Sequence, residues 1–258
     1  MAEKKSFQDK ILPVMVVGLI GAAFALGVMW GKLQVYEKGG VVQNQDQPTA
    51  PTPVPVSIDQ IKALFAEGNI FQGDASRKVL FVEFADPSCP WCHVTSGKNE
   101  VLAKQVLGTR FSSYVAAEPE IRKLVEEGKA SFAWFYRNGH GSGELAAQLL
   151  YCANDLGQFW PVHDQLMSDE GYTTMNEVVG NDMAKLPELM KLVARVPQSG
   201  EMKTCVESGK FKDRPAADTA IGDQLGAGGT PHYFVNTTVF GGAQNFTEMK
   251  PAVDKALE

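Results

Sequence analysis

Two cysteines three positions apart, Cys89 and Cys92, are the residues whose types and spacing most directly suggest chemistry. A C-x-x-C pair supports either thiol redox exchange or metal binding. Pro90 follows the first cysteine, and because proline is favoured at the first position of a helix, we expect Cys89 to be the N-cap. The unpaired N–H groups and positive end of the helix then lower the pKa of Cys89 into the range of about 3.5–7.5 found for activated cysteines. We therefore expect Cys89 to be the exchanging sulfur and Cys92, one turn further in, to be the resolving one.

Two further features are expected to complete this site. Glu83 is the one charged residue in an otherwise apolar run, residues 79–84. A carboxyl group buried under a sheet has a raised pKa, so Glu83 can accept and return the proton of Cys92; a glutamate of an edge strand, exposed to water, is the alternative. Thr230 and Pro231 end a glycine-rich loop that precedes a predicted strand. The bond before Pro231 is of the X-Pro type, which can be cis.

The elements that must position these residues follow from the hydrophobic patterns. Two runs rich in strand formers predict strands, and a short hairpin and a closing helix are predicted near the C-terminus. A long middle region has apolar residues at helical spacing, and a Ser57-x-x-Gln60 capping box opens a short helix. The ranges are strands at 79–84, 130–137, 232–235 and 238–240, and helical segments from 57, at 118–127, within 143–225 and at 246–257. This order predicts an α/β sheet with a helical insertion.

Composition limits the class of protein. The 258 residues are 44% hydrophobic and 21% charged with a formal net charge of −6, which is typical of a globular chain and argues against a broad nucleic-acid-binding face. Four cysteines are too few for a disulfide scaffold of this length. One large domain or two smaller ones are compatible with the length.

The N-terminal region has the pattern of a membrane segment followed by a spacer. Residues 11–31 carry no formal charge over 21 positions, enough to cross a bilayer as a helix, and they are either an uncleaved transmembrane anchor or a signal peptide. The lysines before this segment predict that residues 1–10 are a cytoplasmic tail. Residues 32–57 read as a Pro-rich linker, and a folded domain is predicted over 58–258.

Four motifs together resemble the DsbA-like branch of the thioredoxin superfamily. They are Val-Glu83-Phe-Ala-Asp, Cys89-Pro-Trp-Cys92-His93, Phe159-Trp160-x-x-His163-Asp164 and Gly229-Thr230-Pro231, and the match extends over about residues 70–257. The resemblance implies a thioredoxin-like core sheet with an inserted helical domain at about 139–215. It also implies that Pro231 is cis and packs against the cysteine pair, and that the backbone of Thr230 binds an extended substrate segment.

The residues next to the cysteines are expected to take part in substrate contact. Trp91 lies between the cysteines, and its Pro-Trp dipeptide departs from the best-known DsbA-like proteins, so the redox potential stays open between about −270 and −120 mV. His93 either stabilises the Cys89 thiolate or points to solvent. We expect Thr230, Trp91 and His93 to form the substrate-binding surface.

The other two cysteines, Cys152 and Cys205, are either buried free thiols or a structural disulfide like those of some extracytoplasmic relatives. We favour the disulfide because the resemblance places the domain in an oxidising compartment. It would close a loop of about 53 residues and stabilise the fold by about 4 kcal/mol on the chain-entropy model.

The resemblance implies an enzyme, a thiol-disulfide oxidoreductase held on the extracytoplasmic side of the cell membrane, periplasmic or extracellular. Its partners would be unfolded or folding client proteins with free thiols and a membrane redox partner that resets the Cys89–Cys92 pair, with no cofactor and no bound metal. A reductase or isomerase of the same fold is the first alternative. The others are a c-type haem protein using Cys89-x-x-Cys92-His93, a module that only holds extended clients, and a zinc site on the two cysteines.

Overall fold

The computed structural model describes residues 55–258. The predicted tail and anchor, and all but the last three residues of the predicted linker, therefore lie outside the described residues. Within the described part of the chain, no helix has both the length and the apolar character needed to cross a membrane.

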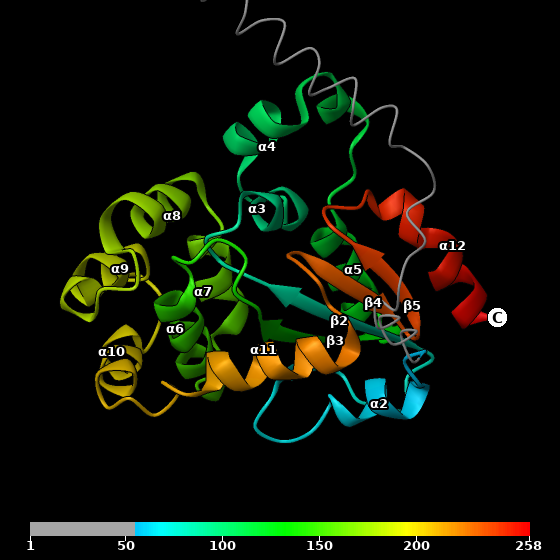
Figure 1. The fold of residues 1–258 in the computed structure, drawn as a ribbon, viewed down its shortest axis with the longest axis horizontal. Coiled ribbons are helices and arrows are strands. Elements are labelled where there is room, and N and C mark those ends of the chain that lie inside the picture. Colours follow the sequence, from blue (N-terminus) through cyan, green and yellow to red (C-terminus); the bar gives the residue numbers. More distant parts are fainter. Residues whose placement is uncertain (1–54) are drawn as a thin grey trace, which may run out of the picture. The chain divides into compact units, whose positions relative to one another are not determined.

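The centre of the fold is a five-stranded mixed sheet (Figure 1). Its strands are β1 (Ile70–Gln72), β2 (Val79–Ala85), β3 (Ala130–Tyr136), β4 (His232–Val235) and β5 (Thr238–Gly241), in the order β1-β3-β2-β4-β5. Only β2 and β3 are parallel; the other neighbours are antiparallel. The sequence patterns predicted four of these strands, and β1 was missed because three residues are too short to show an alternation.

The helices account for most of the remaining described residues. They are α2 (Ile58–Ala63), α3 (Pro90–Ser96), α4 (Glu100–Leu107), α5 (Ala117–Glu126), α6 (Glu144–Asp155), α7 (Phe159–Leu166), α8 (Asp169–Thr173), α9 (Leu186–Leu192), α10 (Ser199–Glu207), α11 (Arg214–Leu225) and α12 (Phe246–Leu257). Two short 3-10 helices, η1 (Gly108–Ser113) and η3 (Met183–Lys185), and one π-helix, η2 (Thr174–Val179), join them. The capping box predicted at Ser57 and Gln60 is confirmed at the start of α2.

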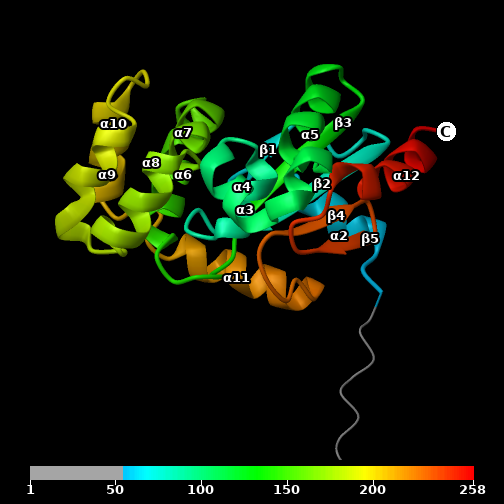
Figure 2. The same cartoon turned by 90° about the horizontal axis from the view of Figure 1, so that it is seen from above.

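Strand β2 separates two hydrophobic cores because successive side chains of a strand point to opposite faces. Its even-numbered residues Leu80, Val82 and Phe84 pack with apolar residues of α2 and α11. Val79 and Phe81 lie in the other core, which extends to residues of α3, α5, α6, α7 and α12. Figure 2 shows α11 on one side of the sheet and α5 on the other. Every residue of β2 is buried, so the prediction of a central strand covered on both faces is confirmed.

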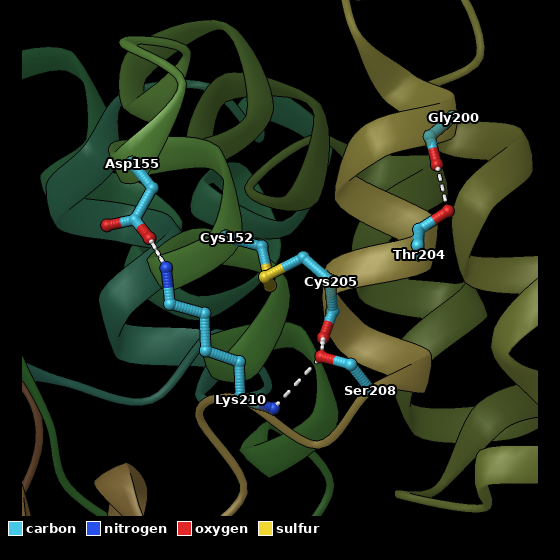
Figure 3. Close-up of a disulfide and its surroundings, with 7 residues drawn as sticks. All are labelled: Cys152, Asp155, Gly200, Thr204, Cys205, Ser208 and Lys210. Carbon is cyan, nitrogen blue, oxygen red and sulfur yellow. Dashed lines mark hydrogen bonds and ion pairs between the residues drawn. A yellow bond between two sulfur atoms is a disulfide. The ribbon is translucent and has the colours of Figure 1, made fainter.

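A disulfide joins two helices of the helical region between β3 and β4. Cys152 of α6 and Cys205 of α10 are bonded, with their Cα atoms 5.9 Å apart (Figure 3). The favoured prediction of a disulfide is thus confirmed and the alternative of two free thiols is wrong. Within the described domain, the helices α8, α9 and α10 lie together, away from the sheet (Figures 1 and 2).

Candidate functional site

The two remaining cysteines lie where β2 gives way to α3. Cys89 is the N-cap of α3 and Pro90 occupies its first turn, as the sequence predicts. Both cysteines are free thiols and both are buried. The Cys89 sulfur does not cap the helix by a hydrogen bond; its thiol donates instead to the carbonyl oxygen of Thr230, at 3.4 Å. The bond between Thr230 and Pro231 is cis, as the resemblance implies, so the glycine-rich loop lies directly against Cys89.

The two thiols have opposite tendencies to ionise. A hydrogen bond from the Cys92 thiol is the largest cause that lowers the pKa of Cys89, which falls to about 6 although burial opposes the shift. The side chain of Thr230 and the charge of His140 add to the lowering. Burial, followed by the hydrogen bond to Cys89, raises the pKa of Cys92 well above its usual value. One thiolate per pair, on Cys89, is therefore the expected form of the reduced protein at neutral pH.

This asymmetry predicts the pH dependence of alkylation. In the reduced protein, the rate at which iodoacetamide modifies Cys89 should rise with pH and reach half of its plateau at about pH 6, because only the thiolate reacts. In the matched variant Cys92→Ala the hydrogen-bond donor is lost, so the midpoint should move to higher pH. A wild-type midpoint close to that of an ordinary thiol would contradict the assignment of Cys89 as the ionised sulfur.

Glu83 lies on β2 and is completely buried. The hydroxyl of Tyr233, its neighbour on β4, donates a hydrogen bond of 2.7 Å to Oε1. The second oxygen, Oε2, has no hydrogen-bond partner among the described residues. Burial raises the pKa of Glu83 to about 7, and the charge of Glu83 is one of the causes that raise the pKa of Cys92. The alternative of a water-exposed edge glutamate is therefore wrong.

A carboxylate that the sequence analysis did not single out holds the loops around the pair together. Asp86 is buried and accepts hydrogen bonds from the backbone N–H and hydroxyl of Ser88 at 2.8 and 2.7 Å, and from the backbone N–H groups of Gly139 and His140 at 2.9 and 2.8 Å. A Cβ atom at Gly139 would overlap the hydroxyl of Thr230, so a larger residue here would require the Thr230 side chain to move. The position of Asp86 in the Val-Glu-Phe-Ala-Asp motif was the available signal for this residue. Its two backbone partners could not be predicted from local sequence, because they lie 53 and 54 residues away.

The two residues flanking Cys92 lie in opposite environments. Trp91 is 37% exposed, which suits a surface that meets a substrate. His93 is completely buried, with its ring nitrogens 2.9 Å from the carbonyl oxygen of Met167 and 2.8 Å from that of Pro87. Burial lowers the pKa of His93 to about 4. The prediction that His93 contacts substrate is wrong, because its side chain packs inward from α3 and links the active-site turn to the end of α7; the alternative of a solvent-facing histidine is wrong for the same reason.

A groove of about 400 Å³ opens beside Trp91. Its lining includes Arg110, Tyr114, Gln244 and Glu248, from η1 and its C-cap and from the segment that starts α12. Trp91 is thus the link between the cysteine turn and a surface able to receive part of a larger molecule.

Comparisons with known proteins agree with this fold. A family model described as thioredoxin matches residues 109–255, more than half of the chain. The chain is 24% identical over 204 residues to a Na(+)/H(+) antiporter, NhaA 3, of Salinispora tropica, a match that covers 78% of this chain and 26% of the antiporter. It is also 24% identical over 199 residues to disulfide bond formation protein D of Bacillus subtilis, covering 74% of this chain and 78% of that protein. The chain thus spans about a quarter of the length of the antiporter relatives that it matches.

Solved structures give the same result. Oxidised BdbD of Bacillus subtilis superposes with a TM-score of 0.57 at 22% identity, covering 74% of this chain and 94% of BdbD. The α-DsbA1 protein of Wolbachia pipientis superposes with a TM-score of 0.57 at 18% identity, covering 78% of this chain and 96% of α-DsbA1. The resemblance to DsbA-like proteins is confirmed at the level of the fold. With its central β2–β3 pair, a cysteine pair at the start of α3 and a family match over most of the domain, the chain belongs to the thioredoxin family.

Proposed function

We propose that this protein is an extracytoplasmic thiol-disulfide oxidoreductase that donates the Cys89–Cys92 disulfide to client proteins. The observation that carries the proposal is the unequal pair at the start of α3: a Cys89 thiol with a pKa of about 6 in contact with a buried Cys92 whose pKa is raised. An exchange enzyme needs one sulfur that is stable as a thiolate and one that stays protonated until it is required.

The reaction balances as a two-electron exchange. A client thiolate attacks the Cys89 sulfur, the Cys89–Cys92 bond breaks, and Cys92 leaves as a thiolate that takes a proton from Glu83. The second client thiol loses its proton and attacks the client sulfur of the mixed disulfide, which releases Cys89 as a thiolate. The client dithiol is oxidised by two electrons to a disulfide, and the enzyme disulfide is reduced by the same two.

The ionisation of Cys89 supports donation over the reverse direction. At neutral pH a thiol with a pKa of about 6 is about 90% thiolate, which stabilises the reduced form about tenfold over a pair with ordinary thiols. For a two-electron couple this factor raises the reduction potential of the pair by about 30 mV, which makes it a stronger oxidant.

The surroundings of the pair support a protein substrate. Thr230 and the cis Pro231 border Cys89, so an extended client segment could lie along this loop and use the backbone of Thr230. Trp91 and its groove offer a contact next to the reacting sulfur. The Cys152–Cys205 disulfide supports an oxidising compartment, since structural disulfides persist there. Residues 11–31 would anchor the domain at the membrane, close to the redox partner that resets the pair.

The reduction potential tests the direction of exchange. The purified full chain would be equilibrated in glutathione buffers of graded ratio, and the fraction of Cys89–Cys92 disulfide determined by thiol labelling. We expect a value more oxidising than about −270 mV, towards about −120 mV. A value at or below the lower limit would favour a reductase, and the absence of any reversible titration would overturn an exchange function altogether.

A further inference from the structure

The helical region contains a segment of unusual backbone geometry that the exchange reaction described above does not use. The segment is η2, a π-helix that continues directly from α8, and π-helices are rare and frequently lie at functional sites. Gly180 ends it in the left-handed conformation. The next residue, Asn181, has a φ of 65°, which is uncommon for a residue other than glycine. Such backbone geometry persists only where the surrounding contacts hold it.

Asn176 of η2 binds the turn that leads into Cys89. Its Nδ2 donates hydrogen bonds to the carbonyl oxygens of Ser88, at 3.2 Å, and of Tyr172, at 3.0 Å. Both partners can only accept, so the nitrogen of the side-chain amide, and not its oxygen, must face them. The Ser88 carbonyl and the Cys89 N–H belong to one planar peptide unit. The bond from Asn176 therefore fixes the orientation of the peptide immediately before the exchanging cysteine.

The preceding carbonyl of the same turn is also in contact with a side chain packed against the helical region. The buried ring of His93 lies between the carbonyl oxygens of Pro87 and of Met167, the C-cap of α7. The ring of Tyr172 packs edge-on against that of His93, with 5.0 Å between the ring centroids. Two successive carbonyl groups before Cys89, those of Pro87 and Ser88, thus have partners that are joined to α7, α8 and η2.

Asn181, directly after η2, binds the loop between β3 and α6, residues 137–143. Its Nδ2 donates to the carbonyl oxygen of Gly141 at 2.6 Å, and its Oδ1 accepts from the backbone N–H of Leu145 at 3.1 Å. Both groups of this amide are therefore used, one on the loop and one on the first turn of α6.

This loop reaches the cysteine pair through two contacts. The backbone N–H of Ser142 donates to the hydroxyl of Ser88 at 3.3 Å. Gly139 lies against the side chain of Thr230, whose carbonyl oxygen accepts the Cys89 thiol at 3.4 Å. Asn176 and Asn181 thus hold two segments that meet at Cys89, the turn before it and the loop that packs against Thr230.

We propose that Asn176 and Asn181, here called the η2 clamp, are positioning residues that fix the Cys89 sulfur relative to Cys92 and Thr230. The proposal rests on the exchange function and gives the helical region a part in setting the reactivity of Cys89. Without the clamp, the turn before Cys89 and the loop at Thr230 lose their ties to η2, and the sulfur can move away from the Cys92 thiol. The hydrogen bond from that thiol is the largest cause of the lowered pKa of Cys89, so its loss makes the thiolate less stable.

The variant Asn176→Leu tests the clamp in the full-length protein. It keeps the approximate size of the side chain, adds no charge and removes both donated hydrogen bonds. The rate at which iodoacetamide modifies Cys89 in the reduced protein would be followed across a pH series. We expect the midpoint to rise by about half a pH unit, which is about a threefold change in the acid dissociation constant and is the size expected for one lost hydrogen bond.

The variant Asn181→Gly tests the other half of the clamp. Glycine adopts a positive φ without strain, so the backbone can keep its conformation while the amide group is removed. The alkylation midpoint should rise in this variant as well, by less than in Asn176→Leu, because Asn181 acts through the loop and Thr230. If Asn176→Leu does not fold, the Asn181→Gly midpoint decides the proposal.

The matched control is Thr173→Val, which removes an exposed hydroxyl group from the end of α8 without changing the charge and should leave the midpoint unchanged. Urea denaturation of each variant separates a loss of stability from a change in Cys89. A folded Asn176→Leu protein that is less stable but has the wild-type midpoint would show a structural role only and overturn the proposal. So would an equal shift in Thr173→Val. The alkylation midpoint needs no client, so a wild type that fails to exchange with glutathione would contradict the proposed function, while the midpoints would still decide the role of the clamp.

Discussion

Replacing Cys89 by serine is expected to reduce the oxidation of a client dithiol to the uncatalysed background. Cys89 is the sulfur with the lowered pKa and the one that contacts Thr230, whereas burial raises the pKa of Cys92. A serine hydroxyl can neither form a disulfide with Cys92 nor accept a client sulfur. The measurement is the rate at which the protein, oxidised beforehand, regenerates the activity of a reduced disulfide-containing test enzyme. A Cys89→Ser variant that works at the wild-type rate would contradict the proposed function.

The companion variant Cys92→Ser separates the roles of the two sulfurs. Cys89 remains a thiolate in this variant and can form a mixed disulfide with an oxidised client, but no neighbouring thiol is left to resolve the bond. Covalent complexes that disappear on reduction should therefore accumulate, visible on a non-reducing gel, while Cys89→Ser yields none. Equal trapping by both variants would mean that either sulfur reacts with clients, against the assignment of Cys89 as the exchanging sulfur.

Removal of the Cys152–Cys205 disulfide should have the largest effect on stability. The bond closes a loop with a sequence separation of 53 residues, and the chain-entropy model gives about 4 kcal/mol for a loop of that length. The double variant Cys152→Ala/Cys205→Ala should lower the free energy of unfolding by about this amount, measured by urea denaturation. The double variant is preferred because it leaves no unpaired thiol on α6 or α10.

The matched control for this prediction is the double variant Cys89→Ala/Cys92→Ala, measured against the reduced wild type. It also removes two sulfur atoms but opens no long covalent loop. Its unfolding free energy should change by clearly less than that of the Cys152→Ala/Cys205→Ala variant. If both double variants have the same effect, or if the loss of Cys152 and Cys205 costs less than about 1 kcal/mol, then cross-linking of the unfolded chain does not explain the stability of the helical region.

Much of the chemistry of the site could be predicted from the sequence, because it depends on residues that are close together in the chain. The C-x-x-C spacing and Pro90 require Cys89 to begin a helix, and the apolar run around Glu83 requires a covered strand. Both features are decided by residues within one turn or one strand. The strand β1, in contrast, has only three residues, and its pairing with β3 is what holds it in place.

His93 shows why one assignment failed. Because His93 follows Cys92, its side chain was expected either to act at the reacting sulfur or to point to solvent. Helix α3 instead turns this side chain inward, between the carbonyl groups of Pro87 and Met167. Met167 is 74 residues further along the chain, and no local pattern signals such a partner. The same holds for Asp86, whose hydrogen bonds to the backbone of Gly139 and His140 arise only when the loop after β3 folds back over the end of β2.

The sequence by itself therefore determined that this chain carries a redox cysteine pair at the start of a helix, a carboxyl group in a buried strand and an α/β fold. Local steric and helix-capping rules are sufficient for those features. Only the tertiary structure decided which neighbour of Cys92 meets solvent, and that Asp86 binds the backbone of the loop after β3. Those properties depend on desolvation and on charges brought together from distant segments, and such energies exist only once the chain is packed.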